Sequence, residues 1–342
     1  MRPPGRHHPN ISRPARQRSH MPNGTVPFNF KNYFENDAYI YYGYVGPIIT
    51  VFVIIMNVLL IATIIKGKFR TSTHAVMVAI AITDILTGII PVPFKTLDFG
   101  VDHVVNFLLI DWCYIFEICQ IILPRVFHLI SLNLTVALSI ERFFVVSFPL
   151  KVKQFCTMRN GTLFSIAVIV ISVCAQIDTF LDVSYEPVKI ISRDRKFTLT
   201  GCRRLIKTRS NEEFIARMFI LRFIPCILLI VFTILLLRKS SDIQKWRKQS
   251  TVSSNAAASL ERMDFAVSLI ASIACVTEIV TASLLLNEHF SSEYRITTEN
   301  ALLSGIIYVV YMTVSPINLA ILCFLSERFR QSFIGLILFC RR

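Results

Sequence analysis

Ionisable side chains lie within or beside long apolar stretches of this sequence, where a charge is unexpected. They are Asp84, Glu117, Arg125, His128, Glu141, Arg142, Arg217, Arg222 and Glu278. A charge inside a membrane helix is costly unless it meets an opposite charge or faces a water-filled cavity. These positions therefore predict internal ion pairs, or a polar binding site inside a helical bundle.

The motifs of the sequence do not indicate catalysis. No G-x-S-x-G occurs, His128 has no second histidine four residues later, and the nine cysteines form no C-x-x-C pair. Nucleophile elbows and zinc sites require such patterns. We therefore expect no enzyme activity, no metal centre and no cofactor, apart from a possible Na⁺ at Asp84. A hydrogen-bonded structural histidine is the simplest interpretation of His128.

Seven apolar spans account for most of the chain. Each is long enough to cross about 30 Å of hydrocarbon, and runs of this length exclude barrel strands. The expected spans are 41–65, 73–94, 113–146, 160–181, 213–238, 263–287 and 299–325. The predicted fold is an all-α membrane protein, a seven-transmembrane helix bundle followed by a short amphipathic helix 8.

The third span is the expected centre of the bundle. Cys113 and Arg142 are 29 residues apart, which is roughly 44 Å of helix and matches a bilayer with its headgroups. Most distinctive side chains of this span fall on one helical face, namely Glu117, Pro124, His128, Ser131, Thr135 and Arg142. We expect this stripe to face the interior of the bundle.

The composition also favours a membrane protein. Of 342 residues, 54% are hydrophobic, and the net charge is +14. The basic loops near 66–70, 151–159 and 238–262 explain this charge as cytoplasmic loops, with the N-terminus outside, so no nucleic-acid partner is expected. The loop 182–212 and the basic N-terminal arm disagree with this orientation.

Three regions are expected along the chain. Residues 1–40 form a disordered extracellular arm with glycosylation acceptors at Asn10 and Asn23. Residues 41–325 form the transmembrane bundle, and 326–342 form the amphipathic helix with a short cytoplasmic tail. A true start at Met21 would remove the basic part of the arm. Cys340 is either a lipidation site or an inert thiol.

Two cysteines fall on the expected outer side, Cys113 at the start of the third span and Cys202 in the loop 182–212. That compartment is oxidising, so we predict a disulfide between them. Two free thiols are the alternative.

A polar network is expected around Asp84, the single charge of the second span. Ser131, Asn57, Ser315 and Asn318 lie at matching depth on other spans. Such a pocket holds water or Na⁺. A structural network without an ion is the equal alternative.

The ordered set of motifs resembles a rhodopsin-like G-protein-coupled receptor. It consists of Asn57, the AITD run ending in Asp84, Ser131, the triplet Glu141-Arg142-Phe143, Pro225 and Asn318. The resemblance implies that Arg142, paired with Glu141 at rest, couples to a G protein. The usual Cys-Trp-x-Pro of the sixth span and Asn-Pro-x-x-Tyr of the seventh are missing, which puts the details of activation in doubt.

A narrower resemblance, to the invertebrate sex peptide receptor and myoinhibitory peptide receptor group, rests on longer runs. These include LPRVFHLISLNLTVALSIERF at 123–143 and SPINLAILCFLSERFRQSF at 315–333. FMRFamide and myosuppressin receptors share the spacing of Pro124 and His128. The resemblance implies a short amidated neuropeptide as extracellular ligand and an inhibitory heterotrimeric G protein as partner, at the plasma membrane.

The predicted ligand pocket combines the charges of the outer halves of the spans. We assign to it Glu117, Arg125, His128, Arg217, Arg222 and Glu278, with Glu278 meeting an amide N–H or an arginine of the peptide. An internal Glu278–Arg222 pair is the alternative. A chemosensory receptor for a small molecule is the alternative function. A multi-pass transporter also tolerates charges in the membrane, but it usually shows internal repeats, and we find none.

Overall fold

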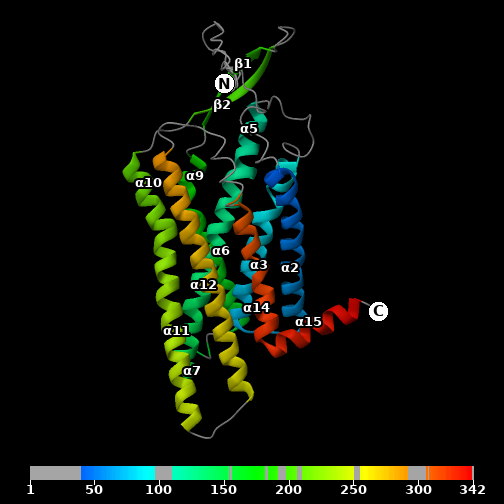
Figure 1. The fold of residues 1–342 in the computed structure, drawn as a ribbon, viewed down its shortest axis with the longest axis vertical. Helices are drawn as coiled ribbons and strands as arrows, with labels where there is room; N and C mark the ends of the chain where they lie inside the picture. Colours follow the sequence, from blue (N-terminus) through cyan, green and yellow to red (C-terminus); the bar gives the residue numbers. More distant parts are fainter. Residues whose placement is uncertain are drawn as a thin grey trace, which may run out of the picture.

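The computed structural model describes residues 40–96, 110–152, 154, 156–181, 184–191, 198–205, 210–249, 255–291, 306 and 308–340. Within these residues the chain is almost entirely helical (Figure 1). Among the described residues, six helical segments are long and apolar enough to cross a membrane. They are Gly43–Lys66, Ser72–Phe94, Cys113–Ser147, Asn211–Lys245, Glu261–Asn287 and Tyr308–Leu325.

These segments are built from shorter elements. The first segment comprises η2 (Ile40–Val45) and α2 (Gly46–Lys66), and the second comprises α3 (Ser72–Ile89) and α4 (Val92–Lys95). The third comprises α5 (Ile110–Glu117), η4 (Ile118–Ile122) and α6 (Leu123–Ser147). α7 (Pro149–Val152) follows α6. The later ones comprise α10 (Asn211–Met218), η5 (Phe219–Phe223) and α11 (Ile224–Gln249), then α12 (Asn255–Ser291), and finally α14 (Ile317–Leu325) within the helical segment Tyr308–Leu325.

The expected central position of the third span is what the structure shows. α6 packs against α3, α8 (Met158–Cys174), α11 and α12. On the predicted stripe, Pro124, Thr135 and Arg142 are buried, while His128 and Ser131 are half-buried. Residues of α6 therefore reach the interior at every level of the bundle.

Prolines explain two widened turns in these helices. The π-helical turn η4 ends two residues before Pro124, and η5 ends two residues before Pro225. A proline lacks a backbone N–H, and its ring clashes with the carbonyl one turn earlier, so the preceding turn widens. The turn η5 carries Arg222, which is buried.

The fourth span differs from the expected single helix over 160–181. α8 (Met158–Cys174) is a 17-residue apolar helix, and a turn separates it from α9 (Ile177–Leu181). The backbone tightens at the turn, where Gln176 N donates to Val173 O at 3.0 Å. The Gln176 amide also folds back onto Ser172 O at 3.2 Å. A seventh span therefore stays a prediction for this part of the chain, and the start of the expected span 299–325 lies outside the described residues.

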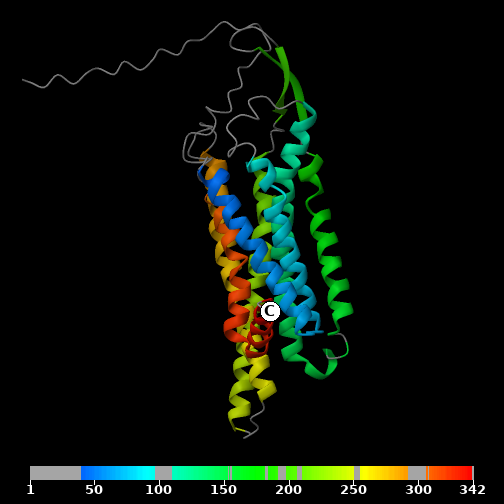
Figure 2. The same cartoon turned by 90° about the vertical axis from the view of Figure 1, so that its right-hand side faces the viewer.

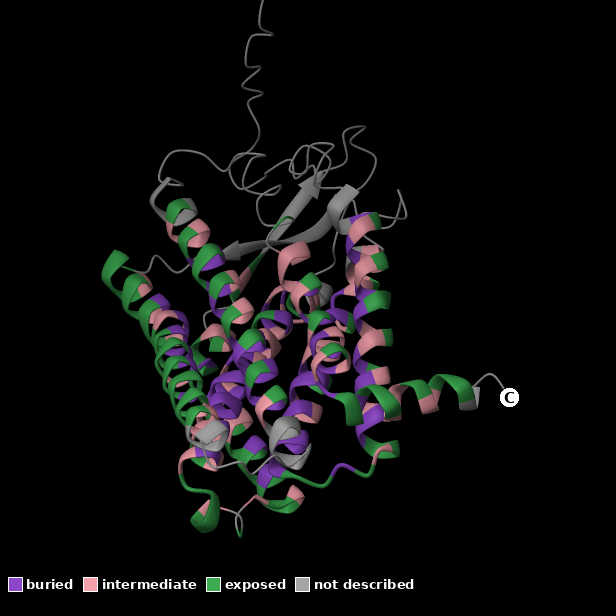
Figure 3. Cartoon of the chain, turned by 60° about the horizontal axis from the view of Figure 1, so that its bottom comes forward, coloured by how far each residue is buried: buried purple, intermediate pink, exposed green. Residues whose placement is uncertain are grey.

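The outward faces of the helices are apolar. On α2, Ile48, Val51, Phe52 and Ile55 are each at least half exposed, and their spacing places them on one face. Figure 3 shows exposed positions on the outer sides of the peripheral helices and buried positions toward the centre. An apolar surface of this extent suits lipid rather than water.

A short helix, α15 (Glu327–Cys340), runs across one end of the bundle (Figures 1 and 2). It packs against α2, where Lys66 Nζ donates to Gly335 O at 2.6 Å. Phe329 is fully buried and stacks on Phe69 with ring centroids 6.0 Å apart. This element agrees with the expected amphipathic segment 326–339, and its role as helix 8 stays a prediction.

A β-hairpin lies at the opposite end, within the region expected to be a loop. β1 (Ser184–Ile191) and β2 (Thr198–Leu205) are antiparallel, with Ser184 opposite Leu205. Both strands pack against α5, above which they are seen in Figure 1. We call this the hairpin end of the bundle, and the other the α15 end.

Cys113, at the hairpin end, is buried and disulfide-bonded. β2 contains Cys202 and packs against α5, but the Cys202 side chain lies outside the described residues. The pairing of these two cysteines therefore stays a prediction. The arm 1–39, with Asn10 and Asn23, is also outside the described residues.

Candidate functional site

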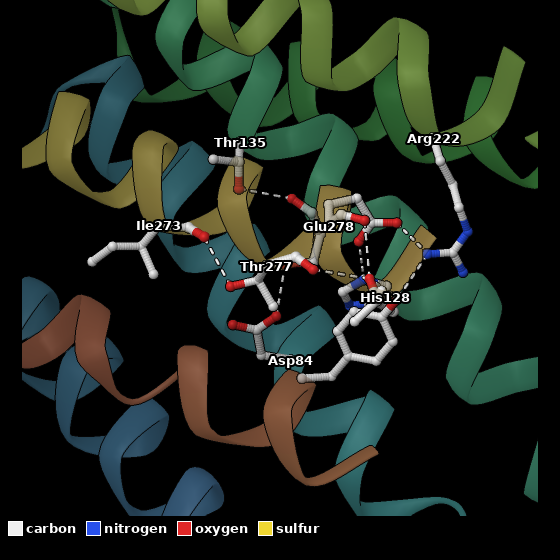
Figure 4. A network of polar contacts seen from close by, with 10 residues as sticks. Asp84, His128, Thr135, Arg222, Ile273, Thr277 and Glu278 are labelled. Atoms are coloured by element: carbon white, nitrogen blue, oxygen red, sulfur yellow. Dashed lines mark hydrogen bonds and ion pairs between the residues drawn. The ribbon is translucent and has the colours of Figure 1, made fainter. Parts of the chain in front are cut away.

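The interior of the bundle contains a charged cluster centred on Glu278 of α12. Its side chain is 1% exposed, and both of its oxygens are engaged. Oε1 pairs with Arg222 Nη1, and Oε2 lies 2.9 Å from His128 Nε2. Figure 4 shows Arg222 and His128 approaching Glu278 from different helices. We call Arg222, His128, Glu278 and Tyr311 the inner cluster.

Tyr311 connects the members of this cluster. Its hydroxyl accepts from Arg222 Nη1 at 2.7 Å and donates to Thr281 Oγ1 at 2.8 Å. Its ring lies against the imidazole of His128, with centroids 3.9 Å apart. The inner cluster therefore joins α6, η5, α12 and the helical segment Tyr308–Leu325.

The energetics favour keeping this cluster intact. A buried ion pair gives little net stability, because desolvation offsets the attraction. Removing one partner is different, since it leaves an uncompensated buried charge and costs about 3–5 kcal/mol. The geometry matches the internal Glu278–Arg222 pair that was one of the two interpretations of these residues. A ligand would have to replace one of the existing partners of Glu278, and its role in ligand binding stays a prediction.

A second polar network surrounds Asp84 on α3. Its Oδ1 accepts from Ser131 Oγ at 2.7 Å, and its Oδ2 accepts from Ser315 Oγ at 2.6 Å. Asn57 Nδ2 donates to Ser315 Oγ at 2.8 Å. The structure thus brings four of the five expected members into one hydrogen-bonded network. Na⁺ binding at Asp84 stays a prediction.

One cavity of about 60 Å³ joins the two networks. Asn318, the fifth expected member, lines this cavity together with Asp84, Ser131, His128 and Glu278. A water needs at least about 10–15 Å³ of such space, so there is room for several waters. Polar groups on four helical segments therefore share one small polar space.

The remaining predicted ligand residues lie nearer the hairpin end. Glu117 is buried, and its Oε2 accepts from the hydroxyl of Tyr185 on β1 at 3.0 Å. Arg217 donates to the hydroxyl of Thr179, which follows α8 on α9. Arg125 is exposed on α6. None of these three residues lines the cavity that joins Asp84 and Glu278.

Toward the α15 end, Arg142 has an ion-pair partner other than the expected one. Its Nη1 lies 3.7 Å from Asp264 Oδ1 on α12, and both side chains are buried. Glu141 instead accepts from Thr73 Oγ1 of α3 at 3.1 Å. Glu141 also stays close enough to Arg142 to interact with it electrostatically, so Arg142 has an acidic neighbour on its own helix as well as Asp264 on α12.

Among the residues that sequence reasoning missed in these networks are Asp264, Tyr311 and Tyr185. Asp264 is an acid at the start of an apolar span, at the same end of the bundle as Arg142. Its position in the sequence could therefore have predicted it as a partner of Arg142. Tyr311 and Tyr185 had no such signal, because an isolated tyrosine is common in apolar helices and loops. Their roles became visible only through the packing that brings them to Arg222 and Glu117.

A bundle of apolar helices with polar groups buried along its axis defines a multi-pass membrane protein. A family model described as "Serpentine type 7TM GPCR chemoreceptor Srw" matches residues 44–340, and the chain belongs to this family. It is therefore a receptor of the G-protein-coupled type and not an enzyme.

Two relatives agree with this assignment. The chain is 26% identical to the sex peptide receptor-related protein 2 of Caenorhabditis elegans, over 90% of this chain and 73% of that protein. It is 25% identical to the sex peptide receptor of Drosophila melanogaster, over 85% of this chain and 71% of that protein.

Proposed function

We propose that this receptor binds a short amidated neuropeptide at the hairpin end and activates a heterotrimeric G protein, of the inhibitory class, at the α15 end. The proposal includes a seven-helix bundle in the plasma membrane, with the N-terminus extracellular and α15 as helix 8. The observation that carries it is the similarity, over most of the chain, to relatives named sex peptide receptors.

The arrangement of polar groups suits a peptide ligand. Glu117 and Tyr185 lie at the hairpin end, where the hairpin packs on α5. The inner cluster lies deeper in the bundle. His128, which contacts Glu278, is 11 residues after Glu117 along α5, η4 and α6. Eleven helical residues correspond to roughly 16 Å. A peptide of a few residues in extended form spans this distance. Its amide or a basic side chain would then reach Glu278.

Transmission to the G protein would use the contacts between α6 and α12. These helices are joined by the His128–Glu278 contact near the ligand and by the Arg142–Asp264 contact near the α15 end. A ligand that changes the first contact shifts the balance between closed and open arrangements. Opening of the second contact would free Arg142 to meet the terminus of a G-protein helix.

A chemosensory receptor for a small molecule is the second candidate. The family description names chemoreceptors, and the cavity of about 60 Å³ beside Glu278 is small for any ligand other than water or a few atoms. A small polar molecule would then bind in the upper bundle without contacting the hairpin.

The test is a screen of the expressed receptor with a G-protein dissociation readout. One panel contains short amidated peptides and their free-acid forms, and the other contains small polar and apolar odorants. A response to amidated peptides that Arg142→Ala abolishes, with surface expression retained, supports the proposal. Responses confined to the small-molecule panel would replace it with the chemosensory function.

A further inference from the structure

The hairpin of β1 and β2 is a two-stranded sheet that stands on α5 at the hairpin end of the bundle (Figures 1 and 2). No other described strand pairs with it. Each strand of such a sheet pairs with its neighbour on one side and directs backbone groups outward on the other side. The hairpin therefore has two outer sides with which a further extended chain could pair.

Tyr185 shows which backbone groups of β1 point outward. Its N–H donates to the hydroxyl of Tyr114 on α5 at 3.3 Å, so it points away from β2. Since the backbone groups of a strand alternate in direction, those of Pro187, Lys189 and Ile191 also point outward. A proline fits such a position, because it has no N–H to give to the ladder. Every second residue of β1, beginning with Tyr185, therefore directs its backbone groups away from β2.

The outer side of β1 is poorly suited to a further strand. Tyr114 already accepts from the N–H of Tyr185, and Pro187 has no N–H. A third strand on this side would lack two successive donors. Natural proteins use prolines and covered ends in the same way to protect the edges of sheets.

The outer side of β2 has no such protection. Residues directly opposite the outward residues of β1 also point outward, and the register places Thr200 opposite Lys189. None of the eight residues of β2 is a proline, and no described backbone group outside the hairpin hydrogen-bonds to them. We call this side the β2 edge, and its outward residues are Thr198, Thr200, Cys202 and Arg204.

β2 leads from the tip of the hairpin toward the bundle. Its last residue, Leu205, lies opposite Ser184, next to the contact of Tyr185 with α5. Successive residues of a strand rise about 3.3 Å, so the outward positions from Thr200 to Arg204 span roughly 13 Å. About four or five residues of an extended peptide cover this length, and the rest of the peptide then continues into the bundle.

We propose that the main chain of the peptide ligand pairs with the β2 edge as a third strand of the hairpin. The inference rests on the proposed function, because it takes the ligand to be a short amidated peptide. The amidated end enters the bundle first, so the peptide runs in the same direction as β2. Strand addition takes its affinity from main-chain hydrogen bonds, which leaves the selection among sequences to the side chains that the peptide meets in the bundle.

N-methylation of single peptide bonds tests the pairing without altering a side chain. The probe is the amidated peptide that gives the strongest response in the ligand screen, together with copies that are N-methylated at one position each. In a paired strand, only every second N–H of the peptide donates to β2. In competition binding to the receptor in nanodiscs, affinity should fall about tenfold at alternate positions of the paired stretch and change less than about threefold between them.

Two proline substitutions at directly opposite positions form a matched pair in the receptor. Thr200→Pro removes an outward N–H of the β2 edge, and Lys189→Pro removes an outward N–H of β1. Neither N–H takes part in the ladder between the strands, so both variants should fold like the wild type. Thr200→Pro should weaken binding of the unmethylated probe about tenfold, whereas Lys189→Pro should leave it within about threefold. If neither variant folds, the N-methylation series decides alone.

The outcomes separate this inference from the proposed function. A receptor that responds to amidated peptides but shows no alternation, or equal losses for Thr200→Pro and Lys189→Pro, keeps the proposed function and overturns the pairing. A lower Tm of Thr200→Pro without peptide, with Lys189→Pro unchanged, would show that another part of this chain covers the β2 edge, and would also overturn the pairing. The absence of a response to every amidated peptide would refute the proposed function and this inference with it.

Discussion

Separating Arg222 from Glu278 is the perturbation with the clearest expected magnitude. Arg222→Met leaves the Glu278 carboxylate, 1% exposed, with only its hydrogen bond to His128 at 2.9 Å. Glu278→Gln leaves the Arg222 guanidinium, 7% exposed, without its carboxylate. Each single change breaks a buried pair and should cost about 3–5 kcal/mol of stability, which is roughly 4–7 °C in Tm for a chain of 342 residues.

The double variant should be less damaged than the sum of the single ones. Arg222→Met combined with Glu278→Gln removes both charges of the pair, so neither is left buried without its partner. The double-mutant cycle should therefore give a coupling energy of at least about 2 kcal/mol. Thermal unfolding of the receptor in nanodiscs measures it, and Arg238→Met, an exposed arginine of α11, serves as control with an expected change within about 0.5 kcal/mol.

The same variants separate a ligand contact from an internal pair. If Glu278 meets the peptide, Glu278→Gln should reduce peptide potency about 30-fold, as for about 2 kcal/mol of a lost charged hydrogen bond, with surface expression retained. If the pair only holds the helices together, the single variants Arg222→Glu and Glu278→Arg should each lose stability. The double variant that carries both substitutions should regain it, because the ion pair is restored with its charges exchanged. Additive losses of stability in the cycle would refute the reasoning about a coupled buried pair.

Three other changes have defined outcomes. Cys113→Ser and Cys202→Ser should each abolish surface expression or response, because closing the long loop stabilises by about 3–5 kcal/mol; full expression of both, measured by surface labelling, would argue for free thiols. Asp84→Asn should weaken any effect of Na⁺ on agonist affinity. Radioligand binding in a sodium salt and in the salt of a large organic cation measures this effect. If the agonist affinity of the wild type is the same in both salts, the network around Asp84 is structural and binds no Na⁺. Asp264→Asn should raise basal GTPγS exchange several-fold by weakening the 3.7 Å contact with Arg142, and unchanged exchange would show that this contact does not hold the resting arrangement.

The helices were predictable because their apolar length is a local property of the sequence. The expected span 113–146 corresponds to the helix Cys113–Ser147, and 213–238 lies within Asn211–Lys245. The break after Cys174 was not predictable, since no proline or glycine marks it and the turn depends on hydrogen bonds of Gln176. The hairpin was missed because its strands pair across positions up to 21 residues apart, as Ser184 and Leu205 are.

The site was predictable in its members but not in its pairing. A charge in an apolar span signals a polar site, and this identified Asp84, Arg222 and Glu278. Which groups meet depends on how the helices pack and rotate, which single-sequence periodicity does not determine. The resemblance to G-protein-coupled receptors implied Glu141 as the partner of Arg142, and only the structure shows the further ion pair with Asp264.

The central claim is that an amidated peptide bound at the hairpin end activates a G protein at the α15 end. The most direct measurement is GTPγS exchange by purified G protein with the receptor in nanodiscs, comparing each amidated peptide with its free acid. The account predicts that an amidated peptide raises exchange well above the free acid, and that Arg142→Ala removes this effect while peptide binding persists. Exchange that no amidated peptide alters, or that amidated and free-acid forms raise equally, would contradict the account.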